Sequence, residues 1–403
     1  MKTRNSMFLL LFFLFGHISN AQSWYLLPTA NGLDEETEDV FFLNPDTGYV
    51  AGWRINNISK TTDGGLTWTP IAGFGVQCMQ AVFFTDANHG FATGCGHTVA
   101  KTTNGGTTWV TETLPNLNTG MGIFFPSPNV GYIVSNVGII FKTSDEGSNW
   151  VNIYQNSNPN IQLSLNEVCF PSPNIGYVVG GARNYSGGID SAVVLKTTDN
   201  GNTWINKSPN LPGLELQSVY FLNDSLGYAV GQNYILKTIN GGDTWSFTID
   251  STWSLGDIAF KNENIGYAVG NNIILETTDG GLTWQSSSYN ETLTAICFSN
   301  NVGYIATYSS QILKNVPVSG IESTDVNKVI KVYPNPVSDE LNIEVDGIIE
   351  DLNFEISNAI GQVVFKGDLV KKAIIKTSSF APGIYLLKLE NGKTIEFKKI
   401  IKV

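Results

Sequence analysis

Six copies of one turn sequence constrain the fold more than any other feature of this chain. Each copy runs from a Lys or Glu through a Thr-rich turn with Gly to a Trp, as in residues 60–68 (KTTDGGLTW). The other five copies end at Trp109, Trp150, Trp204, Trp245 and Trp284. Successive Trp residues lie 39 to 41 residues apart, with one longer interval of 54. This spacing matches one four-stranded propeller blade per copy.

Two other elements recur seven times. One is an apolar strand such as residues 40–42 (VFF), and the other is a Gly-aromatic pair such as residues 48–49 (GY), which follows a turn. The seventh unit stops at Lys314 without its Trp strand, whereas residues 23–28 (SWYLLP) resemble that strand. We therefore predict an all-β, seven-bladed propeller over residues 22–315. Its N-terminal strand completes the last blade and removes two unpaired sheet edges.

The repeated turn resembles the Asp box of sialidases and related propellers. A short acidic or amide side chain accepts backbone N–H bonds within such a turn, Gly tolerates positive φ, and Trp packs between blades. Asn replaces Asp in two copies, which keeps the acceptor and removes the charge, so we interpret these residues as structural. They are Asp63, Trp68, Asn104, Trp109, Asp145, Trp150, Asp199, Trp204, Asn240, Trp245, Asp279 and Trp284.

The repeats as a whole also resemble the photosystem II assembly factor type of propeller, from residue 24 to about residue 315. We take this resemblance as evidence for the scaffold alone. An arginine-rich surface, which the resemblance implies for photosynthetic members, cannot be built from Arg54 and Arg183, the only arginines after residue 21.

Residues 1–21 have the pattern of a signal peptide, with Lys2 and Arg4 ahead of an apolar run and small residues before Gln22. No apolar run is long enough to span a bilayer as a helix. Residues 22–327 carry a net charge of -15, whereas residues 328–403 carry +1. An acidic body repels nucleic acid, so we expect export and no nucleic-acid partner.

The C-terminal residues 328–403 follow a linker, residues 316–327, and alternate like the strands of a small β-sandwich. This tail resembles the type A C-terminal sorting domain of the Bacteroidota type IX secretion system. The resemblance rests on Pro334, Asn335, Pro336, Gly383, Tyr385, Lys398 and Lys399. It implies that the outer-membrane secretion machinery binds the tail and that the protein is released or held at the cell surface. An ordinary sandwich domain is the alternative.

We expect a binding or catalytic site at the mouth of the pore. The residue before each inner strand lies there. Three of these seven residues are acidic: Asp39, Glu167 and Asp257. Such carboxylates could hold calcium or supply the acid and base of glycoside hydrolysis. A solvated acidic rim is the alternative.

A second candidate site is the long insertion of residues 180–190, which lies on the same face. Its polar and aromatic residues could join those of neighbouring loops in an aromatic and guanidinium surface for a glycan or a peptide. The candidates are Trp53, Arg54, Tyr154, Arg183, Tyr185, Asp190, Trp253 and Tyr289.

Cys78 and Cys95 flank one predicted hairpin in matching register, so the alternatives at this pair are a disulfide and two free thiols. Cys169 and Cys297 occupy equivalent positions in different blades, too far apart to pair.

Several enzyme classes are disfavoured by the residues that are present. Sialidases hold their substrate with three arginines, and two remain here. No metal-binding His spacing, Ser-His-Asp set or phosphate-binding loop occurs. We therefore expect a secreted, noncatalytic binding or scaffold protein without a cofactor, calcium excepted. The alternative is a glycoside-active enzyme that uses two of the three carboxylates.

Overall fold

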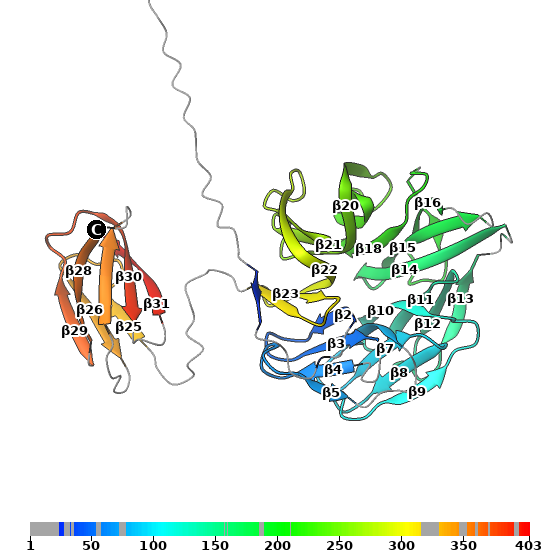
Figure 1. Cartoon of the computed structure of the whole chain (residues 1–403), viewed down its shortest axis with the longest axis horizontal. Helices are drawn as coiled ribbons and strands as arrows, with labels where there is room; N and C mark the ends of the chain where they lie inside the picture. Colours follow the sequence, from blue (N-terminus) through cyan, green and yellow to red (C-terminus); the bar gives the residue numbers. More distant parts are fainter. Residues whose placement is uncertain are drawn as a thin grey trace, which may run out of the picture. The chain divides into compact units, whose positions relative to one another are not determined.

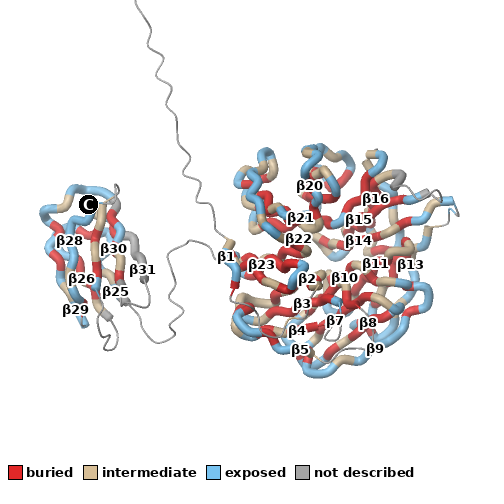
Figure 2. The backbone as a smooth tube through the Cα atoms, in the orientation of Figure 1, coloured by how far each residue is buried: buried red, intermediate tan, exposed pale blue. Residues whose placement is uncertain are grey.

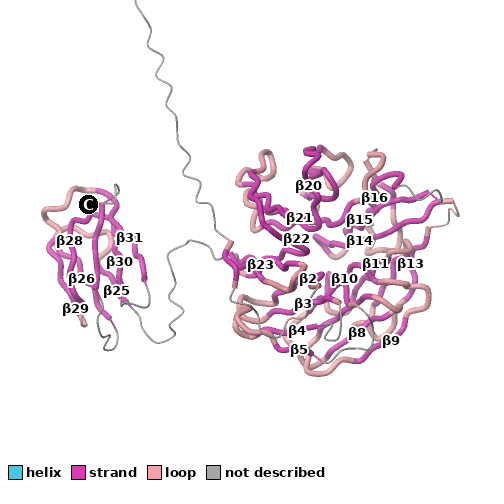
Figure 3. The backbone as a smooth tube through the Cα atoms, viewed as in Figure 1, coloured by secondary structure: helices cyan, strands magenta, loops and turns pink. Residues whose placement is uncertain are grey.

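The computed structural model describes residues 24–27, 33, 36–53, 58–71, 78–156, 158, 160–184, 189–209, 211–315, 330–345, 353–358, 362–369, 371–390 and 395–403. The predicted signal peptide and linker lie outside these residues. The described residues form strands, turns and loops without a helix (Figure 3), so none of them builds a helix that could cross a membrane. The chain divides into two compact units, one of residues 22–316 and the other containing residues 317–403.

The first four blades are separate antiparallel sheets of four consecutive strands. Blades 1 and 2 contain β2 (Thr37–Phe42), β3 (Gly48–Gly52), β4 (Ile58–Thr61), β5 (Thr69–Ile71), β6 (Met79–Phe84), β7 (Gly90–Gly94), β8 (Thr98–Thr102) and β9 (Val110–Thr113). Blades 3 and 4 contain β10 (Gly120–Ser127), β11 (Val130–Ser135), β12 (Ile139–Thr143), β13 (Val151–Gln155), β14 (Ile161–Ser172), β15 (Ile175–Asn184), β16 (Ile189–Thr197) and β17 (Ile205–Asn206). Inner strands such as β2 and β10 face the middle of the ring in Figure 1.

The next three blades share one eight-stranded sheet, because long strands continue from one blade into the next. Seven of the eight strands are β18 (Leu216–Phe221), β19 (Gly227–Thr238), β20 (Ser246–Phe260), β21 (Gly266–Thr277), β22 (Gln285–Ser299), β23 (Val302–Thr307) and β24 (Ile312–Asn315). Residues 246–249 of β20 pair with β19, whereas residues 255–260 pair with β21. One strand is thus the outer strand of blade 5 and the inner strand of blade 6.

The N-terminal strand β1 (Tyr25–Leu26) closes the ring. It pairs antiparallel with β24, placing Tyr25 opposite Lys314 and Leu26 opposite Leu313. β1 therefore supplies the outer strand of blade 7 (Figure 1). The predicted seven-bladed, all-β propeller and its closure between the two ends are confirmed.

Aromatic rings pack the blades against one another. In blade 1 the ring of Phe42 lies over Gly48, where an added Cβ would come within 2.6 Å of the ring, so only Gly fits. The other face of Phe42 stacks on Tyr304 of blade 7, with centroids 3.4 Å apart. This arrangement recurs around the ring and explains the repeated Gly-aromatic pair. Buried residues accordingly fill the inner and middle strands, whereas outer strands such as β9 are exposed (Figure 2).

The Asp-box turns form the internal hydrogen bonds expected of them. Asp63 Oδ1 accepts the backbone N–H of Thr67 at 2.9 Å, and Oδ2 accepts the Thr67 hydroxyl at 2.5 Å. In blade 2, Asn104 Oδ1 accepts the N–H of Thr108, while Asn104 Nδ2 donates to the Thr108 hydroxyl. An amide thus replaces the carboxylate because the threonine hydroxyl can reverse its role.

A lysine joins each of six blades to the next on the Asp-box face, in a contact we call the clamp. Lys60 Nζ donates to the carbonyl of Gly105 at 2.7 Å, and the hydroxyl of Tyr49 donates to the same oxygen at 3.0 Å. The other clamp lysines are Lys101, Lys142, Lys196, Lys237 and Lys314. The Lys that ends the third strand of these repeats is therefore a structural residue.

The C-terminal unit contains two sheets around one apolar core. One sheet has β25 (Ile330–Tyr333), β26 (Glu340–Val345) and β29 (Lys372–Lys376); the other has β27 (Asn353–Asn358), β28 (Val363–Asp368), β30 (Gly383–Glu390) and β31 (Ile395–Lys402). Leu341 and Ile343 of the first sheet pack with Ile356 and Leu387 of the second. The predicted β-sandwich is confirmed.

The sorting motif of this unit contacts the last strand. Asn335 Oδ1, between Pro334 and Pro336, accepts the backbone N–H of Ile401 at 2.8 Å. Tyr385 is buried, and its hydroxyl donates to the carbonyl of Ala381 at 2.9 Å. Gly383 opens β30 beside it. Lys398 and Lys399 belong to β31, but their side chains lie outside the described part.

Candidate functional site

The inner strand of every blade has a β-bulge at the same position. In β2 the pairing to β3 skips one residue between Thr37 and Asp39, and each other inner strand has the same irregularity. The skipped residues are Glu38, Gln80, Met121, Asn166, Gln217, Gly256 and Thr294. A bulge re-aims side chains, so that two successive residues of each strand can face one side.

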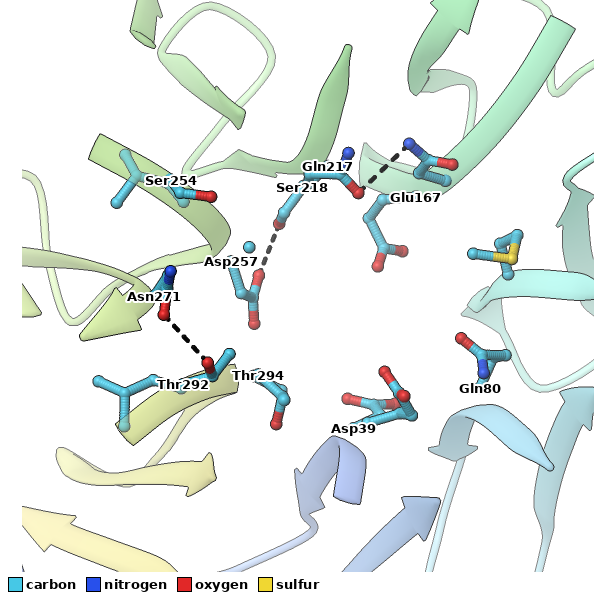
Figure 4. Close-up of a pocket in the computed structure, with 18 of the residues that line it drawn as sticks. Asp39, Gln80, Glu167, Gln217, Ser218, Ser254, Asp257, Asn271, Thr292 and Thr294 are labelled. Carbon is cyan, nitrogen blue, oxygen red and sulfur yellow. Dashed lines mark hydrogen bonds between the residues drawn. The ribbon is translucent and has the colours of Figure 1, made fainter. Parts of the chain in front are cut away.

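These bulges surround a cavity of about 410 Å³ at one mouth of the pore (Figure 4). All seven skipped residues line it, as do six of the seven that follow them. The wall contains four carboxylates, from Glu38, Asp39, Glu167 and Asp257, together with amides and hydroxyls. Among its described lining residues there is no Lys, Arg or His. The structure thus brings the three acidic residues of the sequence prediction into one electronegative cavity.

Both oxygens of Asp39 accept backbone hydrogen bonds. Oδ1 accepts the N–H of Val40 at 2.7 Å, and Oδ2 accepts the N–H of Val82 in blade 2 at 2.9 Å. An inner strand is a sheet edge, and its pore-side N–H groups have no strand to pair with. Asp39 therefore satisfies such groups from two blades and joins them.

Asp257 has the same role between blades 6 and 7. Its Oδ1 accepts the Ser218 hydroxyl at 2.6 Å and the N–H of Ile258 at 2.7 Å. Its Oδ2 accepts the N–H of Ile296 in blade 7 at 2.7 Å. Neither of these two aspartates has an oxygen left without a hydrogen bond.

Glu167 differs from the two aspartates. Its Oε1 accepts the N–H of Val168 at 2.8 Å, but within the described residues its Oε2 accepts no hydrogen bond. Blade 3 has Gly122 at the neighbouring position, where an added Cβ would lie 3.0 Å from Oε1. The missing side chain leaves room for the Glu167 carboxyl, which points into the cavity (Figure 4).

The pKa values of all three carboxyls are raised. Burial raises the pKa of Asp39 to about 7, and the charge of Asp257 adds to the rise. Burial raises the pKa of Asp257 to about 6, and it raises the pKa of Glu167 well above the usual glutamate range. Each side chain nevertheless keeps partial solvent contact through the cavity. A hydrogen-bond donor or a cation that enters would favour their ionised forms.

A polar network at Asn166, next to Glu167 in the chain, links blade 4 to blade 5. Asn166 Nδ2 donates to Glu215 Oε1 at 3.0 Å and to the carbonyl of Leu216 at 2.9 Å. Arg183 Nη2 pairs with Glu215 Oε2 at 2.7 Å. Arg183, predicted to bind a ligand, therefore holds the long strands of blade 4 against blade 5.

The other predicted binding residues do not form one surface. Trp53 lies beside the cavity, 36% exposed, and its Nε1 donates to Glu38 Oε1 at 2.6 Å. Arg54, Tyr185 and the side chain of Asp190 lie outside the described part.

The remaining three aromatics lie in three different places. Trp253 is buried in the core between blades 5 and 6, because packing a large ring removes apolar area from water. Tyr154 packs against the core of blades 3 and 4 from β13. Tyr289 lines a separate cavity with Glu291 and Gln311. The buried ring of Trp253 is therefore unavailable for a ligand, whereas the binding role of Tyr154 and Tyr289, which are half-buried, stays a prediction.

The structure also bears on metal and thiol chemistry. Its described residues include no group of three or more His, Cys, Asp or Glu side chains placed to hold a metal ion. Cys78 and Cys95 form a disulfide next to the cavity residue Gln80. Cys169 and Cys297 are free, and burial raises the pKa of Cys169 to about 12, so its thiol stays protonated.

Sequence reasoning missed the bulge residues. Strict alternation along a strand sends neighbouring side chains to opposite faces, so only one residue per blade was assigned to the pore mouth. The available signal was the polar residue that precedes several of those positions, namely Gln80, Asn166 and Gln217.

Two family models match parts of the chain. Residues 331–403 match the secretion system C-terminal sorting domain, and residues 73–159 and 247–317 match the photosynthesis system II assembly factor YCF48. No curated protein matches the chain. The resemblances stated from the sequence for the tail and for the propeller are confirmed.

Similar solved structures show the fold. A structure described as YCF48 bound to D1 peptide is 23% identical, with a TM-score of 0.57, and the match covers 73% of this chain and 94% of that one. YCF48 from Cyanidioschyzon merolae is 20% identical, with a TM-score of 0.57 and coverages of 73% and 98%. PorZ, a surface component of the type IX secretion system of Porphyromonas gingivalis, is 12% identical, with a TM-score of 0.55 and coverages of 94% and 60%.

Proposed function

Because the chain carries a type IX sorting domain behind a propeller and is therefore exported, we propose that the propeller is a noncatalytic binding module. Its ligand would enter the cavity at the pore mouth. The observation that carries this proposal is which oxygens of the cavity carboxylates already accept hydrogen bonds from the protein. Asp39 and Asp257 have every oxygen engaged by groups of their own or other blades, whereas within the described residues Glu167 and Glu38 each keep one oxygen that accepts no hydrogen bond.

This distribution favours binding over glycoside hydrolysis. Retaining and inverting glycosidases need two carboxyl groups on the reacting bond, one as acid and one as base or nucleophile. If Asp39 or Asp257 were the second group, it would have to abandon backbone N–H groups that are costly to leave without a partner. The cavity wall instead offers the amides of Gln80, Gln217 and Asn271 as hydrogen-bonding groups.

A peptide is the first ligand class to test. The structurally similar YCF48 is described as bound to a peptide, and an electronegative cavity suits a basic side chain or an amino group. A glycan is the second class, because carboxylate, amide and hydroxyl side chains can also bind sugar hydroxyls.

The glycoside-active alternative rests on one observation. The raised pKa of Glu167 is what a general acid requires near neutral pH. If this alternative held, hydrolysis would depend on Glu167 together with Asp39 or Asp257.

The deciding experiment measures binding and cleavage on the same samples. The processed chain is screened against a random peptide library and a panel of polysaccharides, with calorimetry for binding and a reducing-sugar assay for release. The test variant is Glu167→Gln. The matched control is Glu263→Gln, the same change at an exposed residue outside the cavity. Binding without release, weakened at least tenfold by the first variant alone, is the expected result. Sugar release abolished by Glu167→Gln would overturn the noncatalytic assignment.

A further inference from the structure

The six clamp lysines differ in the residue that lies beside them. Each pairs with the first residue of its blade's outer strand, and side chains directly opposite in an antiparallel pair lie on the same face. For Lys60 this neighbour is Thr69, whose hydroxyl forms no hydrogen bond within the described residues. Ser246, beside Lys237, donates its hydroxyl to the Lys237 carbonyl at 3.1 Å. The other four neighbours are Val110, Val151, Ile205 and Tyr25.

A cavity of about 390 Å³ lies beside Lys60, between blades 1 and 2. Lys60 carries the one formal charge among its described lining residues, and four threonines line it as well. Two of these threonines donate their hydroxyls to groups of their own turns, Thr67 to Asp63 at 2.5 Å and Thr107 to the carbonyl of Asn104 at 2.9 Å. The hydroxyls of the other two, Thr62 and Thr69, form no hydrogen bond in the described part of the chain. The cavity thus contains one ammonium group and two hydroxyl groups that can donate.

Four other clamp lysines have a carboxylate of the protein nearby. These carboxylates come from the outer strand of the same blade or from the turns of the next blade, and their charges interact with the lysine. The pairs are Lys101 with Glu112, Lys142 with Asp199, Lys196 with Asp243, and Lys314 with Asp46 and Asp63.

Around Lys60 the equivalent positions hold uncharged residues. The equivalence follows the shared backbone contacts: Gly64 donates its N–H to the carbonyl of Asp46, and Gly105 donates its own to that of Asn88. None of these positions therefore supplies Lys60 with a carboxylate, and the cavity leaves room for an anionic group from outside. The uncharged residues are Asn88 for Asp46, Asn104 for Asp63 and Asp199, Thr107 for Asp243, and Ile71 for Glu112.

We propose that this cavity binds an anionic oxygen group of a ligand, a carboxylate or a phosphate. The ammonium group of Lys60 has three N–H donors, and its hydrogen bond to the carbonyl of Gly105 uses one of them. The remaining donors form charge-assisted hydrogen bonds to the anion, and the hydroxyls of Thr62 and Thr69 complete its coordination. The inference does not depend on the proposed function, because the two cavities share no described lining residue.

A neighbouring charge limits the strength of this binding. Asp63 belongs to the same turn as Thr62, although it does not line the cavity, and its negative charge repels an anion. We therefore expect weak binding, and the test uses a readout at Lys60 itself with the probe in large excess.

The experiment uses the clamp lysines as controls for one another. The processed chain is acetylated with an activated ester in sodium phosphate, in sodium glucuronate, or in sodium chloride of the same ionic strength. Mass spectrometry of the peptides gives the rate at each lysine. Either probe should slow acetylation of Lys60 by about threefold or more, because a bound anion covers the amine and keeps it protonated. At Lys142, which has Val151 and Asp199 nearby, the change should stay below about 1.5-fold.

Two variants test the hydroxyls. Thr69→Val introduces the residue that blades 2 and 3 carry at this position, so the blade can accommodate it. Thr69→Val and Thr62→Val should each reduce the protection of Lys60 to less than about 1.5-fold, since the anion loses a donor. The matched control is Thr103→Val, the same change at the position of the next turn that is equivalent to Thr62, and it should leave the protection intact. An unchanged melting temperature shows that each variant is folded.

Each outcome bears on the proposal. Protection by phosphate alone would assign a phosphate group, and protection by glucuronate alone a carboxylate. Glucose, the neutral counterpart of glucuronate, should give no protection. An equal effect of glucose, equal protection of all six clamp lysines, no protection of Lys60, or full protection in both variants would overturn the proposal.

Discussion

On the Asp-box face the same side chains recur in blade after blade, whereas at the pore mouth each blade presents a different one. Six lysines make one contact with six equivalent carbonyls. The ring at the mouth instead contains Asp39, Ala81, Gly122, Glu167, Ser218, Asp257 and Ala295. A residue that repeats satisfies a demand of the blade itself, because every blade has the same backbone.

Variation alone, however, does not identify a functional residue. Asp39 and Asp257 occupy a variable ring and still serve the scaffold, since each joins two blades through backbone N–H groups. Glu167 belongs to the same ring but keeps an oxygen without a partner in the described structure. The hydrogen bonds of each side chain separate the two roles, and the following experiments test that separation.

The largest loss of stability is expected from a substitution on the Asp-box face, where the same residues recur in successive blades. Trp68 is buried between blades 7 and 1, so Trp68→Ala should destabilise the propeller by about 3–5 kcal/mol through lost burial and the cavity left behind. Urea unfolding followed by fluorescence measures the loss. Leu66→Ala in the same turn is the control: Leu66 is 51% exposed, and its change should stay within about 0.5 kcal/mol. Equal losses would show that the turn, not the Trp, provides the stability.

The second effect is a difference in stability between a substitution of Asp39 and a substitution of Glu167. In Asp39→Asn the amide nitrogen must face one of the two N–H groups that the carboxylate accepts, which should cost about 1–3 kcal/mol although a buried charge is removed. Glu167→Gln leaves an oxygen for its single backbone donor and should change stability by less than about 0.5 kcal/mol. Thermal and urea unfolding of both variants provide the comparison. If the two changes cost the same, the division of roles is wrong.

The third effect is a pH dependence of opposite sign on the two faces. Asp39 and Asp257 have raised pKa values in the folded protein, about 7 and about 6. The folded state therefore holds more protons than the unfolded state between about pH 4 and pH 7, and stability falls as the pH rises through this window.

The aspartates of the Asp boxes make the stability depend on pH with the opposite sign. Hydrogen bonds from the side chains of Asn149 and Thr203 lower the pKa values of Asp145 and Asp199 to about 2. Their contribution is complete above about pH 4 and is lost as the pH falls toward 2. The melting temperature should therefore peak near pH 4 to 5. Asp39→Asn should flatten the upper side of the peak and Asp145→Asn the lower side; unchanged profiles would contradict the assignment.

The smallest effect tests the tolerance of the turn. Asn104→Asp restores the carboxylate of the other boxes, and the Thr108 hydroxyl can turn to donate to it. Stability at pH 7 should change by less than about 0.5 kcal/mol. Asp63→Asn is the reciprocal change, with the same expected size. A loss above about 2 kcal/mol in either variant would mean that the charge itself matters in these turns.

Much of the architecture could be predicted from the residues alone. The spacing of Trp68, Trp109 and their equivalents determined the blade length. The unpaired Lys314 strand and the residues around Trp24 determined the closure, because a sheet edge left open is unfavourable. The position of Asp39, Glu167 and Asp257 at one pore mouth followed from the same repeat, since equivalent residues of a ring occupy equivalent places.

Only the tertiary structure decided which of those residues are free to act. The bulges bring Gln80, Asn166 and Gln217 to the cavity, and they arise from strand pairing between segments, which alternation along one segment does not reveal. The N–H groups that Oδ2 of Asp39 and Oδ2 of Asp257 accept belong to the next blade, more than 30 residues further along the chain. Contacts between residues so far apart in the chain cannot be predicted from the local sequence. The sequence by itself therefore determined the ring and the route of export, and the assembled ring alone decided that Asp39 and Asp257 serve the scaffold whereas Glu167 keeps an oxygen for a ligand.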